Sequence, residues 1–237
     1  VAAVAAAGCS TLPLYREPAP EPPQTVAEVR SCRDVVCTPN VGQPVEILAL
    51  VTAVDDFDEN GDGGGTGTIF FRDPAGGPFT GLQAYNPTLA PLFATIQAGD
   101  LVRARGEFIE FLLVRGGVPV DPTLRTTPEI QNGSISKIGE TGPPVPIVIA
   151  APAELSTDPQ ARGWIGSLVT IANVNATAAP DPTYGEILLD VPNLKISREL
   201  YEIPGVAAGT HFSSLTGVLN YFFGYKLLPR GPEDVVP

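Results

Sequence analysis

The stretch VEILALVTAV, residues 45–54, is a long run of mostly branched apolar residues. A run of this kind between turn residues is typical of a buried β-strand. The chain contains a second such run and two further pairs of matching segments: WIGSLVTIANV (164–174); GTIFFRDP (67–74) with YGEILLDVP (184–192); AGDLVRARGEFIEF (98–111) with AGTHFSSLTGVLNYFF (208–223). The same order of segments therefore recurs after about 110 residues, which predicts two tandem β units.

Proline and glycine residues stand between these apolar runs. The chain of 237 residues contains 26 prolines and 25 glycines. In this setting both residue types favour turns, so we expect an all-β protein rather than a low-complexity chain. Each unit has enough strands to close on itself, which predicts two small β-barrels. We place them at residues 25–150 and 151–237, after an extended apolar and proline-rich N-terminal arm at residues 1–24.

Glycine also predicts two finer features of the first unit. Gly106 interrupts the alternating run LVRARGEFIEFLLVRG, and we expect a bend there between two separate strands. The dipeptide Asn132-Gly133 within EIQNGSISKIG is the favoured pair for a type I′ turn. That segment is therefore predicted to be a hairpin.

The segment TVAEVRSCRDVVC, residues 25–37, is predicted to form a short helix. Thr25 stands at the N-cap position and Glu28 three residues later, which is the spacing of a capping box. Cys32 and Cys37 are separated by four residues, a loop that a disulfide bond can close. A tetrahedral metal site is disfavoured because no second pair of cysteine or histidine residues completes it. A buried pair of reduced thiols is the alternative.

Three segments together resemble the OB-fold-like modules of bacterial secreted and surface proteins: TAVDDF…IFFRDPAGGPFTGLQAYNP, AGDLVRARGEF and SSLTGVLNYFFGYKLLPRGPEDV. The last of these carries the pattern that ends such modules, and the resemblance covers roughly residues 43–237. It implies that the two barrels are OB-like and that the chain lies outside a bacterial cell or on its surface. It implies no activity, because the catalytic domains that accompany these modules are separate from them.

The charge of the chain disfavours nucleic acid as a partner. The formal net charge is −12 and the isoelectric point about 4.4, with 14 lysine and arginine residues against 26 aspartate and glutamate residues. Proteins that bind DNA or RNA need a basic surface to displace counterions from phosphates. We expect no binding to nucleic acid or to anionic lipid headgroups.

The acidic stretch DFDENGDGGGTG, residues 56–67, is the segment that most resembles a ligand site. Asp58, Asn60 and Asp62, followed by Gly63, fit the first half of a calcium-binding loop. The second half departs from the motif, because Ile69 stands where a bidentate glutamate is expected. Calcium is therefore a candidate cofactor at Asp58, Asn60 and Asp62. The alternative is a soluble, glycine-rich hairpin tip.

The sequence does not indicate an enzyme. His211 is the only histidine and falls within a predicted strand, where the neighbouring residues Ser213 and Ser214 face opposite sides. We interpret His211 as a hydrogen-bonded residue of the barrel, and we assign no catalytic residue. No nucleotide-binding or metalloprotease motif occurs.

Aromatic residues gather near the C-terminus as Tyr221, Phe222, Phe223 and Tyr225. On a strand, Phe222 would face the opposite side from Tyr221 and Phe223, so one face of this strand is expected to enter the barrel core. A stacking platform for sugars or single strands is the alternative interpretation. Trp164, at the start of the second unit, is likewise predicted to be a core residue.

The N-terminal segment VAAVAAAGCS gives rise to the leading functional hypothesis. The chain contains no methionine, which favours a processed chain whose apolar start belongs to the mature protein. An apolar strand on a proline-rich spacer can add to the sheet of a neighbouring subunit, as in donor-strand assembly. We therefore expect a non-enzymatic extracellular structural protein that polymerises into a surface filament, with copies of itself as partners.

The alternative hypothesis is a lipid-anchored binding module. The residues AAGC, which end at Cys9, resemble a bacterial lipobox, with Ala6 in place of the commoner leucine. An acylated Cys9 would tether the barrels to a membrane, and the barrels would bind a glycan or a protein partner. Contact with a membrane is expected only if Cys9 is acylated.

Overall fold

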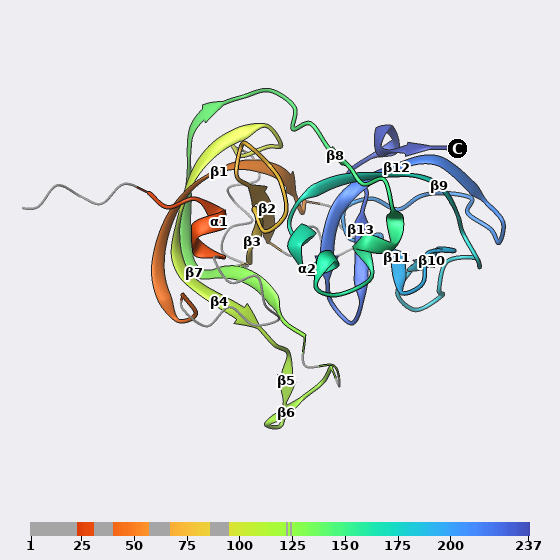
Figure 1. The fold of residues 1–237 in the computed structure, drawn as a ribbon, viewed down its shortest axis with the longest axis horizontal. Helices are drawn as coiled ribbons and strands as arrows, with labels where there is room; N and C mark the ends of the chain where they lie inside the picture. The colour runs from red at the N-terminus through yellow and green to blue at the C-terminus, as the bar shows by residue number, and fades with distance from the viewer. Residues whose placement is uncertain (1–22, 31–39, 57–66, 86–94, 122, 124) are drawn as a thin grey trace, which may run out of the picture.

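Two β-rich lobes lie side by side in the structure, which is a computed structural model (Figure 1). It describes residues 23–30, 40–56, 67–85, 95–121, 123 and 125–237. The described helices are short, namely α1 (Val26–Val29), α2 (Gln160–Trp164) and the 3-10 turns η2 (Pro152–Leu155) and η3 (Pro232–Asp234). The predicted all-β class is confirmed.

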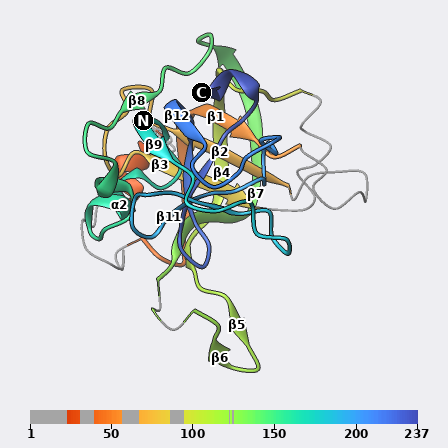
Figure 2. The same ribbon diagram turned by 90° about the vertical axis from the view of Figure 1, so that its right-hand side faces the viewer.

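The first lobe is a closed barrel in which the strands follow the order β1-β2-β3-β7-β4. β3 and β7 pair in parallel, and the other neighbours are antiparallel. A small hairpin, formed by β5 and β6, projects from the connection between β4 and β7 (Figures 1 and 2). The strands of this lobe are β1 (Gln43–Val54), β2 (Thr68–Arg72), β3 (Gly81–Tyr85), β4 (Asp100–Phe111), β5 (Val114–Arg115), β6 (Val118–Pro119) and β7 (Thr127–Glu140).

The second lobe is a sheet with the order β10-β11-β13-β12-β9-β8, in which β14 also pairs with β12. Its strands are β8 (Ile147–Val148), β9 (Leu168–Asn175), β10 (Ile187–Leu188), β11 (Leu194–Ile196), β12 (His211–Tyr221), β13 (Tyr225–Leu228) and β14 (Val235–Val236). A bridge between Ala176 and Leu189 links the ends of β9 and β10, which is the counterpart of the pairing that closes the first barrel.

The two lobes share one strand order. In both, the second, third, fifth, fourth and first strands of the unit are neighbours, and the third pairs in parallel with the fifth. This is the Greek-key order of an OB-like barrel. The repeat in the sequence therefore corresponds to a repeat of topology.

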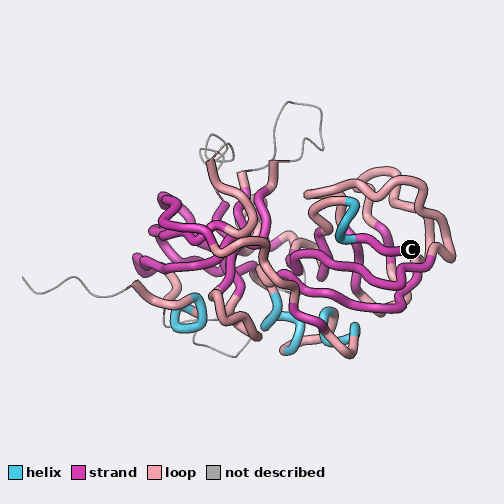
Figure 3. Tube along the Cα trace, turned by 90° about the horizontal axis from the view of Figure 1, so that it is seen from above, coloured by secondary structure: helices cyan, strands magenta, loops and turns pink. Residues whose placement is uncertain are grey.

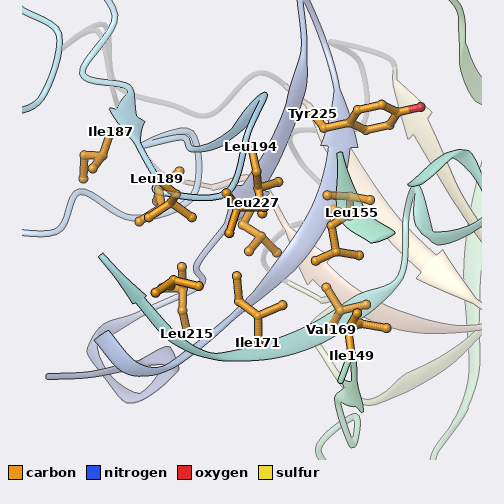
Figure 4. Close-up of a cluster of buried hydrophobic side chains, with 14 of the residues drawn as sticks. Ile149, Leu155, Val169, Ile171, Ile187, Leu189, Leu194, Leu215, Tyr225 and Leu227 are labelled. Atoms are coloured by element: carbon orange, nitrogen blue, oxygen red, sulfur yellow. The ribbon is translucent and has the colours of Figure 1, made fainter. Parts of the chain in front are cut away.

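Each lobe has its own apolar core. In the first, the inward residues of the five barrel strands meet Val26 and Val29, which α1 inserts at one end of the barrel. In the second, side chains from β9, β11, β12 and β13 pack together with Leu155 (Figure 4). Ile165 belongs to the same cluster. Trp164 is partly buried against this second core, in agreement with its predicted place.

The capping box predicted at the start of α1 is present. The Thr25 side chain accepts a hydrogen bond from the Glu28 amide at 3.1 Å, and the Glu28 carboxylate accepts one from the Thr25 amide at 2.7 Å. Asp73, in the turn after β2, accepts the next two helix amides at 2.6 and 2.9 Å. The helix is shorter than predicted, because it ends at Val29 with Arg30 as its C-cap.

Both glycine predictions in the first lobe are wrong. β4 runs unbroken through Gly106, and β7 runs unbroken through Asn132-Gly133. The pairing register between these two strands shifts around Gly106, so the glycines mark a β-bulge. A Cβ on Gly133 would lie 1.9 Å from the Arg105 carbonyl oxygen, and one on Gly106 would lie 2.4 Å from Ile130. Glycine is required there because two strands approach closely.

The two lobes pack through outward-facing residues of their sheets. Phe70 on β2 and Ala53 on β1 join Leu168, Val218 and Leu228 of the second lobe in one buried cluster. All five residues of β2 are buried for this reason, since one face covers the barrel core and the other covers the second lobe. Viewed from above, the strands of the two lobes lie next to each other (Figure 3).

Backbone meets backbone at the centre of this interface. A Cβ on Gly81 of β3 would lie 2.4 Å from the Ile165 carbonyl oxygen, and one on Gly166 would lie 2.3 Å from the Leu82 amide nitrogen. The Arg30 guanidinium fills the same junction and donates hydrogen bonds to the Gly81, Ile165 and Arg162 carbonyls at 2.5, 3.1 and 2.7 Å. One buried side chain thus connects α1, the first barrel and the second lobe.

Substitution of Gly81 by alanine should destabilise the protein. The new methyl group has no room beside the Ile165 carbonyl, so the lobes must shift apart or β3 must bend. We expect the free energy of unfolding, measured by urea denaturation, to fall by about 1–3 kcal/mol. Gly139→Ala is the matched control, because nothing lies within 4 Å of a Cβ there. Equal stability of the two variants would contradict the close contact.

Candidate functional site

A cleft of about 440 Å³ lies between the two lobes. The first lobe contributes side chains from β2, β3, β7 and the end of β4, and the second contributes side chains from β12, β13 and the segments around β10 and β11. The lining residues are Thr68, Tyr85, Phe111, Leu113, Glu129, Tyr184, Glu186, Ser197, Glu199, Asn220, Tyr221, Phe222 and Lys226. The volume is within the range that small-molecule sites occupy.

Exposed aromatic rings form part of the cleft wall. Tyr85 ends β3 and is 41% exposed, Tyr184 precedes β10 and is 69% exposed, and Phe222 follows β12 and is 43% exposed. The Lys226 ammonium lies 5.7 Å from the centre of the Phe222 ring. Large rings that remain exposed on a folded surface favour contact with a ligand.

The four residues of the C-terminal aromatic cluster differ in burial, and the division between them is not the predicted one. Tyr221 and Tyr225 are buried and pack edge to face with ring centres 5.0 Å apart, as the core interpretation predicts. The predicted alternation is wrong for Phe222 and Phe223, which are both 43% exposed. β12 ends at Tyr221, and Phe223 and Gly224 turn the chain with positive φ values of 54° and 128°. Alternation does not apply inside a turn.

Glu129 is the buried carboxylate of the cleft. It lies on β7, is 2% exposed, and accepts hydrogen bonds from the side-chain amides of Gln83, at 3.0 Å, and of Gln131. Burial raises the pKa of this carboxyl above its ordinary value of 4.5; the two amide hydrogen bonds oppose that rise, and the charge of Glu110 adds to it.

The Glu186 carboxylate, in contrast to that of Glu129, is paired with cations. It forms ion pairs with Lys195, at 2.8 Å, and with Lys226. Burial acts to raise the pKa of Glu186, but the hydrogen bonds and charges of the two lysines outweigh it and lower that pKa. The cleft therefore presents one carboxylate that is fully paired with cations and one that is paired only with neutral amides.

The turn at Phe223 and Gly224 borders a second hollow, of about 540 Å³, whose polar groups largely form hydrogen bonds or ion pairs with one another. The Tyr225 hydroxyl donates to Asp158, Arg125 pairs with Asp158 at 2.5 Å, and the Tyr221 hydroxyl donates to Asp121. Burial and the Asp158 carboxylate raise the pKa of Tyr225. The buried Glu129 carboxylate of the cleft is paired only with neutral amides, and for this reason we take the cleft as the candidate site.

Of the residues singled out in the sequence, Tyr221 and Phe222 line the cleft, and His211 does not. Cys9, Cys32, Cys37, Asp58, Asn60 and Asp62 lie outside the described residues, so the disulfide, acylation and calcium predictions stay predictions. Across the described part of the chain, no group of three or more histidine, cysteine or carboxylate residues could hold a metal ion. No described helix is long and apolar enough to cross a membrane.

His211 is hydrogen-bonded, as the sequence predicts, and it lies at an exposed position. Its Nδ1 lies 3.0 Å from Oδ1 of Asn175, whose amide nitrogen donates to Asp190 at 2.7 Å. The Ser213 hydroxyl donates to the carbonyls of Val236 and Pro237 instead of approaching the imidazole. These partners position the C-terminal strands rather than a nucleophile.

The comparisons with known proteins identify no family. No protein-family model matches the chain, and no curated protein does. Among solved structures the chain is similar to one described as a "putative aspartyl-tRNA synthetase" from Leishmania major Friedlin, with 11% identity and a TM-score of 0.33. The match covers 55% of this chain and spans 23% of the length of the other. A TM-score of this size carries no argument about fold or function.

Substitution of Glu129 by glutamine should change how stability depends on pH. Because the folded-state pKa is raised, the contribution of Glu129 to stability is fully present below pH 4.5, the ordinary value, and is lost as pH rises through the folded-state pKa. Glutamine does not titrate, so the variant does not lose this contribution as the pH rises. We expect the free energy of unfolding of Glu129→Gln, relative to wild type, to increase between pH 4.5 and 8 in urea denaturation series.

Glu46→Gln is the control for this series, because its effect on stability changes only below pH 4.5 and with the opposite sign. Hydrogen bonding to Arg105 lowers the pKa of Glu46, so its contribution is present above the ordinary value and is lost as pH falls through the folded-state pKa. A Glu129→Gln profile parallel to that of Glu46→Gln would contradict the raised pKa.

Proposed function

We propose that this protein is a non-enzymatic binding module that holds a ligand in the cleft between its two lobes. One observation carries the proposal: aromatic and polar side chains from both lobes converge on a cleft of about 440 Å³ whose walls are fixed by a buried interface. A site on rigid strands, with apolar walls and a few polar groups, has the composition of a ligand pocket.

The place of the cleft on the barrel supports the same function. It is reached from β2, β3 and the connection after β4, which are the parts of an OB barrel that bind ligands elsewhere. This support rests on analogy between folds. The three glutamates and one lysine of the lining disfavour a nucleic acid or another polyanion.

The filament hypothesis depends on a different part of the chain. Its assembly strand, residues 1–12, lies outside the described residues, so the structure adds no support to it. Polymerisation, the lipid anchor at Cys9 and the extracellular location remain predictions from the sequence. A module that binds a ligand in its cleft is compatible with either means of attachment.

The proposal is tested by titration of the whole chain with n-butylammonium chloride, n-butanol and chitotriose, followed by 1H–15N spectra. At least one probe should shift the amide resonances of cleft residues such as Glu129, Asn220 and Lys226. Phe222→Ala should weaken that binding about tenfold, because it removes a large apolar contact.

Phe223→Ala is the matched control for this titration. Phe223 is the sequence neighbour of Phe222 and equally exposed, but it does not line the cleft. If no probe shifts the cleft residues, or if both phenylalanine variants bind equally well, the cleft is not the binding site.

A further inference from the structure

The carboxylate of Glu129 has a partner set that differs from those of two nearby glutamates, Glu110 and Glu186. Glu110 pairs with Arg162 at 2.5 Å, and Glu186 pairs with two lysines. Glu129 is the most deeply buried of the three, yet it forms no ion pair with any lysine or arginine in the described ranges, and its hydrogen-bond donors are neutral amides. A buried carboxylate without a cation is electrostatically costly.

A second acceptor near Glu129 is also left without a donor. Gln83 commits its amide nitrogen to Glu129 at 3.0 Å, which fixes the orientation of its amide group. The Gln83 Oε1 atom then has no hydrogen-bond partner, although the residue is only 8% exposed. Buried acceptors of this kind are normally satisfied by a donor from protein, water or ligand.

The surrounding charges favour a cation as the source of those donors. The charge that acts on the pKa of Glu129 is that of Glu110, which is negative. The formal charge of the whole chain, −12, has the same sign. A neutral hydroxyl group would satisfy the acceptors but would leave the negative charge of Glu129 without a counterion.

The walls of the cleft indicate which chemical group should carry the positive charge of the ligand. Tyr85, Tyr184 and Phe222 offer apolar faces, which suit an alkyl stem, and electron-rich rings, which attract a cation. A primary ammonium group brings three N–H donors and no acceptor, so it matches the ionised Glu129 carboxylate, which offers only acceptors. A guanidinium group needs a planar, two-oxygen partner, and Glu129 already uses both its oxygens for amides.

We propose that the ligand of the cleft carries a primary ammonium group on an apolar stem, and that Glu129, which lines the cleft, receives this group between the aromatic walls. This inference rests on the proposed binding function and names its ligand class. A lysine side chain and an amino sugar share the chemistry, and the experiment distinguishes these two sources.

The test compares n-butylammonium with n-butanol, which has the same length and lacks the charge, by 1H–15N titration of the whole chain at pH 7. We expect the ammonium to bind at least tenfold more tightly than the alcohol, with shifts at Gln83 and Glu129. Glu129→Gln should reduce ammonium binding about tenfold, while Glu233→Gln, on the exposed turn η3, should not. Higher salt should weaken the ammonium complex.

A second measurement separates ligand contact from a structural role of Glu129. In wild type, the carboxyl 13C resonance of Glu129 should report a lower pKa when butylammonium is bound, because the cation favours the ionised form. Acetyl-lysine amide and glucosamine, titrated in the same way, show whether the stem is an alkyl chain or a sugar ring.

The outcomes separate the two proposals. If butanol or chitotriose binds in the cleft as well as butylammonium, or if the Glu129 pKa is unchanged by the ammonium, the ligand class is wrong and the binding function stands. If none of the probes reaches the cleft, both proposals fail.

Discussion

The contact between Gly81 and Gly166 is the constraint on which the rest of the structure depends. At this point two backbones approach so closely that neither residue has room for a side chain. The Arg30 guanidinium locks the junction by binding carbonyls from both lobes, and the apolar cluster around Phe70 extends it. Two barrels that could each fold around their own core are thereby held in one orientation.

This orientation creates the cleft. Neither lobe alone encloses it, because β3 and β7 supply one wall and the turn between β12 and β13 supplies the other. The polar chemistry of the cleft has separate causes. Burial raises the pKa of Glu129, while Lys195 on β11 and Lys226 on β13, in the same lobe as Glu186, lower the pKa of Glu186. The interface thus determines the shape of the site, and ion pairs within the second lobe determine the charge state of Glu186.

The strands could be predicted from the sequence because their signal is local. Alternation and turn residues located β1, β2 and β9, and the internal repeat indicated that the lobes share an order of strands. The bulge at Gly106 and Gly133 could not be predicted in this way, since its cause is the approach of two strands distant in sequence. A glycine pattern alone is equally consistent with a bend or a hairpin.

The candidate site was missed for a related reason. Its wall residues come from segments as far apart as Thr68 and Lys226, and no motif connects them. Two signals were available: the aromatic cluster, of which Tyr221 and Phe222 line the cleft, and Glu129, a carboxylate beside apolar Ile130 in a predicted strand. The role of Glu129 depends on the groups that cover it in the folded chain.

The central claim is therefore that the lobes have one fixed orientation, and residual dipolar couplings of both lobes in one weakly aligned sample test it directly. A single alignment tensor for the two lobes is the predicted result; two different tensors would contradict it.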